Sequence, residues 1–94
     1  MYKTDGTHAE IKQALRDAGV AFLDKAACSG LGCDFIARHV RTGQAVFLEA
    51  KTWDNRKRLT DSERALRALF PEAFFVPTDA AEALVACGVK VGTA

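Results

Sequence analysis

The sequence has little of several residue types and patterns, and each shortage excludes a class of protein. No apolar run approaches the roughly 20 residues that a membrane-spanning helix needs, and residues 1–6 lack the apolar core of a signal peptide. Only three cysteines and two histidines occur in the 94 residues. Cys28 and Cys33 do not have the spacing of a zinc knuckle. We therefore expect a cytoplasmic protein with reduced thiols, without a zinc site and without contact to a membrane.

The charge is nearly balanced overall but unevenly distributed. The net charge of +1 says little about a polyanionic partner, whereas residues 38–67 hold eight basic and four acidic side chains. This middle third includes Arg56, Lys57 and Arg58, which suit contact with phosphates or form an ordinary solvated loop. The chain is 49% hydrophobic and 27% charged, which is typical of a folded protein. Its length fits one domain over residues 1–94.

Hydrophobic periodicity and capping signals predict the element order α-β-β-β-α-β-α. Helices are expected to begin at Thr7 and Thr60, each followed three residues later by the glutamate of a capping box. Thr78 is expected to cap the last helix. Short apolar segments predict strands at residues 20–23, 34–40, 45–51 and 73–76. The expected fold class is α/β, with a mixed sheet of about four strands flanked by helices.

The predicted hairpin brings three charged side chains to one face. If residues 42–43 form a two-residue loop, Asp34 faces Lys51, and Glu49 lies on the same side. A change of one residue in the loop would reverse the faces. The opposite face supports the predicted register, because it then holds apolar residues suited to a core: Phe35, Ala37, Leu48 and Ala50.

Two carboxylates and a lysine at the end of a hairpin have a clear chemical use. Asp34 and Glu49 offer the hard oxygen ligands that Mg²⁺ or Mn²⁺ requires. A bound ion would stabilise charge on a phosphoryl oxygen, while Lys51 could orient or deprotonate a water, or offset the developing negative charge. The alternative is a structural salt bridge between Asp34 and Lys51, worth about 0–1 kcal/mol at a surface. That alternative leaves Glu49 unexplained in an otherwise apolar strand.

The pattern Asp34-x14-Glu49-Ala50-Lys51, on a hairpin preceded by a helix, resembles the PD-(D/E)XK nuclease superfamily. More closely, it resembles the VRR-NUC branch, which includes small stand-alone phage and bacterial proteins. The resemblance covers roughly residues 8–88 and rests on four segments. These are the glycine-containing approach to the aspartate at 30–36, the E-x-K strand at 47–52, the start of the second helix at 58–64, and the closing strand and helix at 74–84.

The resemblance implies a role for each matching position. Asp34 and Glu49 would be ligands of Mg²⁺ or Mn²⁺, with the backbone carbonyl of Ala50 as a third ligand and Lys51 as the catalytic lysine. Glu10 matches an acidic residue of the first helix that often joins such sites as a metal ligand and catalytic residue. Glu10 also completes the capping box expected at the start of that helix, so both roles stay open.

Two positions depart from the family pattern. Cys33 stands where a proline commonly precedes the aspartate, which changes backbone stiffness but no ligand. Glu63 stands where related sequences often have a glutamine near the active centre. A glutamate there would weaken the approach of a phosphate or bind a second ion, or it would simply complete the capping box of Thr60.

The resemblance implies hydrolysis of DNA phosphodiester bonds by a Mg²⁺- or Mn²⁺-dependent endonuclease. A homodimer is expected, and its two-fold symmetry suits branched or double-stranded DNA such as a Holliday junction. The rivals are a non-catalytic nucleic-acid-binding protein on the same fold and a phage interaction protein with an incidental E-x-K. Candidate contacts to the DNA backbone, which would set affinity rather than sequence preference, are Lys25, Ser29, Gly30, Arg56, Lys57 and Arg58.

Overall fold

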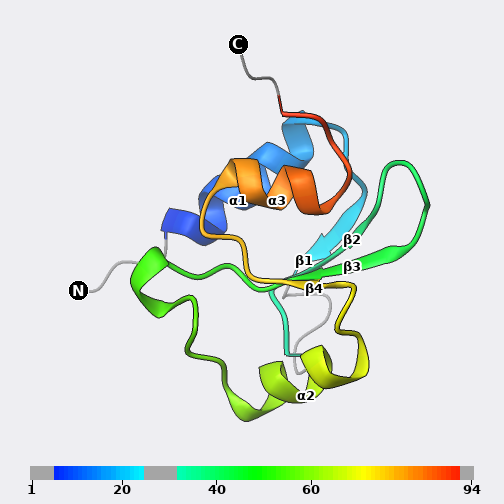
Figure 1. Ribbon diagram of the computed structural model, residues 1–94. Helices are drawn as coiled ribbons and strands as arrows, with labels where there is room; N and C mark the ends of the chain where they lie inside the picture. Colours follow the sequence, from blue (N-terminus) through cyan, green and yellow to red (C-terminus); the bar gives the residue numbers. More distant parts are fainter. Residues whose placement is uncertain (1–5, 25–31, 92–94) are drawn as a thin grey trace.

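The structure, a computed structural model, describes residues 6–24 and 32–91 (Figure 1). It contains a mixed four-stranded sheet in the spatial order β1-β2-β3-β4. The first three strands are antiparallel neighbours, and β4 lies parallel to β3. The strands are β1 (Phe22–Asp24), β2 (Phe35–Arg38), β3 (Ala45–Leu48) and β4 (Phe74–Phe75).

Helices cover both faces of this sheet. In Figure 1, α1 (Gly6–Asp17) and α3 (Ala80–Ala86) lie side by side over one face, and α2 (Asp61–Leu69) lies on the other. A 3-10 helix, η1 (Trp53–Asn55), follows β3. The predicted α/β class and the order α-β-β-β-α-β-α are therefore confirmed. Within residues 6–24 and 32–91, no helix is long and apolar enough to cross a membrane.

The two faces of the sheet have apolar clusters of different size. The larger cluster lies under α1 and α3, and it buries the alternate strand residues that the sequence assigns to the core face. Its members are Ile11, Leu15, Val20, Phe35, Ala37, Val46, Leu48, Ala50, Ala83 and Cys87. The smaller cluster, on the side of α2, consists of Cys33, Leu66 and Phe74. The charged residues at the strand ends lie on the side of the smaller cluster.

The hairpin register predicted from the sequence is wrong by two residues, whereas the predicted faces are right. Pairing between β2 and β3 ends where the N–H of His39 donates to the carbonyl of Gln44 at 2.8 Å, so the loop is 40–43. Phe35 accordingly pairs with Leu48. Because side chains alternate between faces, a shift of two residues leaves every side chain on its predicted side.

The side chain of His39 accounts for the longer loop. Its Nδ1 accepts hydrogen bonds from the backbone N–H groups of Arg41 and Thr42, each at 3.2 Å. Gly43 then closes the loop with a φ of +77°, a conformation that glycine adopts without a steric cost. A two-residue turn at Thr42-Gly43 would forgo these side-chain bonds.

Two predicted helix starts are corrected by the structure. The first helix already includes Gly6, the first residue of the described part, so Thr7 lies inside the helix and does not cap it. The last helix is capped by Asp79, whose side chain accepts from the N–H of Glu82 at 2.9 Å. Thr78, predicted as that cap, donates its own N–H and hydroxyl to the Glu82 carboxylate instead. Aspartate, with a charged acceptor oxygen, is the better N-cap at this helix.

Gly32 brings the segment before β2 against the first turn of α2. Its φ is +82°, and a Cβ added there would lie 2.5 Å from the backbone carbonyl oxygen of Ser62. Real Cβ atoms do not approach a backbone oxygen so closely. The glycine therefore sets the position of Asp34 relative to α2.

We expect Gly32→Ala to lower the free energy of unfolding by about 2–4 kcal/mol, because a steric clash adds to the cost of a positive φ. Gly19→Ala is the matched control, since Gly19 also has a positive φ, +74°, but nothing lies within 4 Å of its added Cβ. That control should lose only about 1 kcal/mol. Thermal unfolding followed by circular dichroism measures both, and equal losses would contradict the close approach.

Candidate active site

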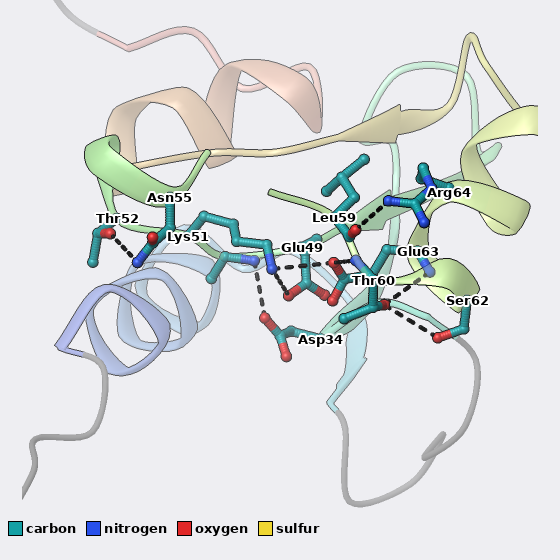
Figure 2. Close-up of polar contacts among 11 residues, drawn as sticks. Asp34, Glu49, Lys51, Thr52, Asn55, Leu59, Thr60, Ser62, Glu63 and Arg64 are labelled. Atoms are coloured by element: carbon teal, nitrogen blue, oxygen red, sulfur yellow. Dashed lines mark hydrogen bonds and ion pairs between the residues drawn. The ribbon is translucent and has the colours of Figure 1, made fainter. Parts of the chain in front are cut away.

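The ends of the two central strands bring Asp34 and Glu49 together. Asp34 directly precedes β2 and Glu49 directly follows β3, on the side of the sheet opposite the buried pair Phe35 and Leu48. Asp34 is 8% exposed and Glu49 is 7% exposed. Figure 2 shows the ammonium of Lys51 paired with the carboxylate of Glu49, and Asp34 at the neighbouring strand end. Asp34, Glu49 and Lys51 therefore lie on one face, as strand alternation predicted, although the residues that face each other across the two strands differ from the predicted pairs.

The carboxylate of Asp34 is held by the backbone of the neighbouring strand end. Its Oδ2 accepts a hydrogen bond from the N–H of Ala50 at 2.9 Å, in a buried position. A carboxylate has acceptor capacity for several bonds, so this contact orients Asp34 without using all of it. The N–H of Ala50 thus already serves the site. The predicted role of its carbonyl as a metal ligand stays a prediction.

Lys51 lies between two glutamates. Its Nζ is 3.1 Å from Oε1 of Glu63 and 3.6 Å from Oε2 of Glu49, and its side chain is only 16% exposed. Within the described parts of the chain, Asp34 is not among its ion-pair partners. The alternative of a simple cross-strand salt bridge between Asp34 and Lys51 is therefore wrong about the partner.

Glu63 takes one of the roles that the sequence left open, while its effect on an approaching phosphate or a second ion stays a prediction. As predicted, it completes a capping box: Oε1 accepts from the N–H of Thr60 at 2.9 Å, and its own N–H donates to the Thr60 hydroxyl at 3.2 Å. The same Oε1 pairs with Lys51, so the first turn of α2 is tied to the end of β3 (Figure 2). The sequence signal for this contact was the position of Glu63 near the expected active centre.

The electrostatics of the cluster follow from burying three carboxylates with one ammonium. Burial raises the pKa of Glu49, and the nearby charges of Asp34 and Glu63 raise it further against the opposing effect of Lys51, to about 8. Burial alone would raise the pKa of Glu63, but hydrogen bonds from Thr60 and Lys51 outweigh it and lower that pKa. Glu49 is therefore the carboxyl that holds a proton at neutral pH.

The pKa of Lys51 is raised, which keeps the side chain an ammonium. Burial acts in the opposite direction, but the hydrogen bond to Glu63 and the negative charges of Glu49 and Glu63 outweigh it. Lys51 consequently acts as a fixed positive charge and hydrogen-bond donor in this arrangement. Of the roles considered from the sequence, offsetting negative charge fits this state better than deprotonating a water.

The donor set suits a hard divalent cation. Asp34 and Glu49 provide oxygen ligands, and a cation between them would relieve the repulsion that raises the pKa of Glu49. In residues 6–24 and 32–91, no group of three or more His, Cys, Asp or Glu side chains is arranged to hold a metal ion. Two carboxylates with several waters are a common ligand set for Mg²⁺, so the residues present fit that ion.

Glu10 has a structural partner that neither predicted role includes. Its Oε2 accepts a hydrogen bond from the N–H of Ala80, the first residue of α3, at 3.1 Å. Since Thr7 lies within α1, the predicted capping box with Glu10 is wrong. Glu10 instead joins the two helices of the larger cluster, and its place among metal ligands stays a prediction.

The residues predicted to contact the DNA backbone divide into three groups. Lys25, Ser29 and Gly30 lie outside the described residues. Lys57 and Arg58 are exposed. Arg56 is partly buried because its guanidinium stacks on the Trp53 ring, with Cζ 3.4 Å from the ring centroid. Sequence reasoning missed Trp53, although its position between Lys51 and three basic residues was a usable signal.

The raised pKa of Glu49 predicts a stability change for Glu49→Gln in the absence of metal. Its folded pKa of about 8 exceeds the ordinary 4.5, so its stabilising effect is complete below pH 4.5 and lost as the pH rises through 8. A neutral glutamine avoids that loss. We expect Glu49→Gln to be more stable than wild type by about 1–2 kcal/mol at pH 9 with EDTA, and by much less at pH 5.

Thermal melts at both pH values measure this difference. Glu72→Gln serves as the control, because Glu72 is exposed and its substitution should change little at either pH. An unchanged difference between wild type and Glu49→Gln at pH 5 and pH 9 would contradict the assignment.

Comparisons of the chain with protein-family models, with curated proteins and with solved structures find no match. The functional conclusion therefore depends on the residues and geometry described above.

Proposed function

We propose that the chain is a metal-dependent nuclease that hydrolyses phosphodiester bonds in DNA. The observation that carries the proposal is the buried cluster of Asp34, Glu49 and Lys51 at one end of the central hairpin. In the absence of a cation, the cluster leaves Glu49 protonated at neutral pH. A site built for stability alone would gain from apolar residues of similar volume at these buried positions.

The resemblance to the VRR-NUC branch of the PD-(D/E)XK superfamily supports the same proposal. The mixed sheet and its helices are compatible with that fold. The segments that resemble the family are also in contact: Gly32, before the aspartate, lies against Ser62 at the start of α2. Glu63 in the same turn reaches Lys51 of the E-x-K strand.

Each residue has a task that its contacts support. Asp34 and Glu49 would hold Mg²⁺ or Mn²⁺, with the carbonyl of Ala50 as a further ligand. When bound, the ion supplies positive charge to the scissile phosphate and activates water. The N–H of Ala50 keeps Asp34 oriented. Lys51, held protonated by Glu49 and Glu63, donates to the attacking or leaving oxygen and offsets negative charge there.

The substrate is proposed from charge and from the family resemblance. Exposed Lys57 and Arg58 contact the DNA backbone and make binding dependent on salt. A homodimer acting as an endonuclease on branched or double-stranded DNA is the proposed working form. The second candidate, a non-catalytic nucleic-acid-binding protein on this fold, retains those contacts but needs no protonated lysine beside two carboxylates.

Cleavage of supercoiled, branched and single-stranded DNA with Mn²⁺ tests the proposal. Asp34→Asn keeps an acceptor for the N–H of Ala50 but removes a charged ligand. Lys51→Met keeps most of the side-chain volume but removes the ammonium. Each substitution should lower the cleavage rate by about 10²-fold or more. Asp34→Asn should keep an unfolding midpoint close to that of the wild type, whereas Lys51→Met should melt lower because Glu49 and Glu63 lose their ammonium partner, so thermal melts must show that it is folded at the assay temperature.

Lys90→Met is the matched control, because Lys90 is exposed and lies after α3, and it should cleave at the wild-type rate. Cleavage that survives both Asp34→Asn and Lys51→Met would overturn the assignment of the site. An inert wild type that still binds DNA would favour the non-catalytic candidate.

Metal binding should depend on pH because Glu49 must lose its proton to become a ligand. With the pKa of Glu49 raised to about 8, affinity for Mn²⁺ should rise up to about tenfold per pH unit from pH 6 and level off above pH 8. Isothermal titration in buffers with different heats of ionisation measures both the affinity and the released proton. Glu49→Gln should show no such heat. A Mn²⁺ affinity that does not change between pH 6 and pH 8 would contradict the proposed ligand role of Glu49.

A further inference from the structure

The exposed side chain of Trp53 follows directly on the candidate active site and has no role in the function proposed so far. It is the only tryptophan in the sequence, and it is 61% exposed. It opens η1, two residues after Lys51. Two residues span at most about 7 Å of backbone, so the ring is attached close to the reactive groups. A large exposed aromatic surface beside such groups is typical of a binding residue.

The turn that carries Trp53 is held by several local contacts. The Arg56 guanidinium stacks on the ring, and its Nη1 donates to the carbonyl of Trp53. Asn55 closes the turn by donating its side-chain Nδ2 to the hydroxyl of Thr52 at 3.1 Å, as Figure 2 shows, and its N–H to the Thr52 carbonyl at 3.0 Å. A ring held in this way loses little conformational entropy when a ligand stacks on it.

Trp53 and the stacked Arg56 form a platform whose chemistry fits an unpaired nucleobase rather than an intact duplex. One face of the indole carries Arg56, and with 61% of the residue exposed the indole offers surface on which an aromatic ring can stack. Unpaired nucleobases offer such rings, and their phosphates would meet the exposed Lys57 and Arg58. In an intact duplex the base faces are already stacked on one another, so a smooth duplex would gain nothing from Trp53. Polyanionic chains with free aromatic rings are therefore the ligand class that matches all three side chains.

We propose that Trp53, with Arg56 behind it, stacks on an unpaired base next to the scissile phosphate and selects DNA that contains single-stranded segments or branch points. Because Trp53 follows Lys51 by two residues, at most about 7 Å of backbone, the ring can reach a base close to the phosphate at the active centre. This inference rests on the proposed nuclease function, because it assigns the substrate class of the same site.

Intrinsic fluorescence reports on the proposal directly, since the chain has no other tryptophan. The full chain is titrated in EDTA, to prevent hydrolysis, with an oligothymidylate, with a branched DNA that has unpaired bases at its centre, and with a blunt duplex. We expect saturable quenching with the first two DNAs and little quenching with the duplex. Undiminished fluorescence, when anisotropy of a labelled oligothymidylate shows saturation, would overturn the proposal.

Substitutions separate stacking from general affinity. Trp53→Ala should weaken binding of the single strand about tenfold, while Trp53→Phe should keep most of the affinity and blunt-duplex binding should change less than about twofold. Leu69→Ala is the matched control, because Leu69 is 73% exposed but lies on α2. Thermal melts check that each variant is folded. Wild-type affinity in Trp53→Ala, or an equal loss for single strand and duplex, would contradict stacking.

The inference and the proposed function fail in different experiments. A chain that binds single strands through Trp53 in EDTA but hydrolyses nothing in Mn²⁺ would retain the stacking site and lose the nuclease. A chain that hydrolyses DNA at the same rate with Trp53→Ala, on both single-stranded and duplex substrates, would retain the nuclease and lose the stacking site.

Discussion

The ammonium of Lys51 joins the first turn of α2 to the end of β3. It lies 3.1 Å from Glu63 in the first turn of α2 and 3.6 Å from Glu49 at the end of β3. Among the described residues, the cluster under α2 has three buried apolar members, against ten under α1 and α3, and its partly buried members are Ile36, Phe47, Leu59 and Val76. The position of α2 therefore depends strongly on polar contacts: the ion pair, the capping box of Thr60 and the close approach of Gly32.

Burying these charged groups lowers the stability of the fold at the site where catalysis is proposed. Charged groups removed from water must be compensated by partners, and three carboxylates with one ammonium remain negatively unbalanced. The protonation of Glu49 is the response of the isolated chain. A divalent cation would remove the same imbalance without a proton. The site is thus less stable than an apolar packing of the same volume would be, as is common where binding or catalysis is selected.

The sequence predicted the parts of the site that depend on alternation along a strand. Asp34, Glu49 and Lys51 share a face for any loop that changes the register by an even number of residues. The wrong loop length therefore did not affect the predicted face of these three side chains. The sequence offered only Asp34 as an ion-pair partner of Lys51, which is wrong. The observed partner Glu63 depends on how a connector without hydrophobic periodicity, residues 53–59, returns α2 to the sheet. Glu10 shows the same limit, since its hydrogen bond joins it to Ala80, 70 residues along the chain.

The positive charge available to a substrate is also smaller than the composition suggests. Residues 38–67 carry eight basic side chains, but three of them are engaged within the protein. Lys51 pairs with two glutamates, Arg56 stacks on Trp53, and Arg64 binds Asp61 and the carbonyl of Leu59. With fewer phosphate contacts, electrostatic affinity falls and its salt dependence becomes shallower. The proposed nuclease would then need a second source of affinity, and stacking on an exposed aromatic ring adds affinity without adding charge.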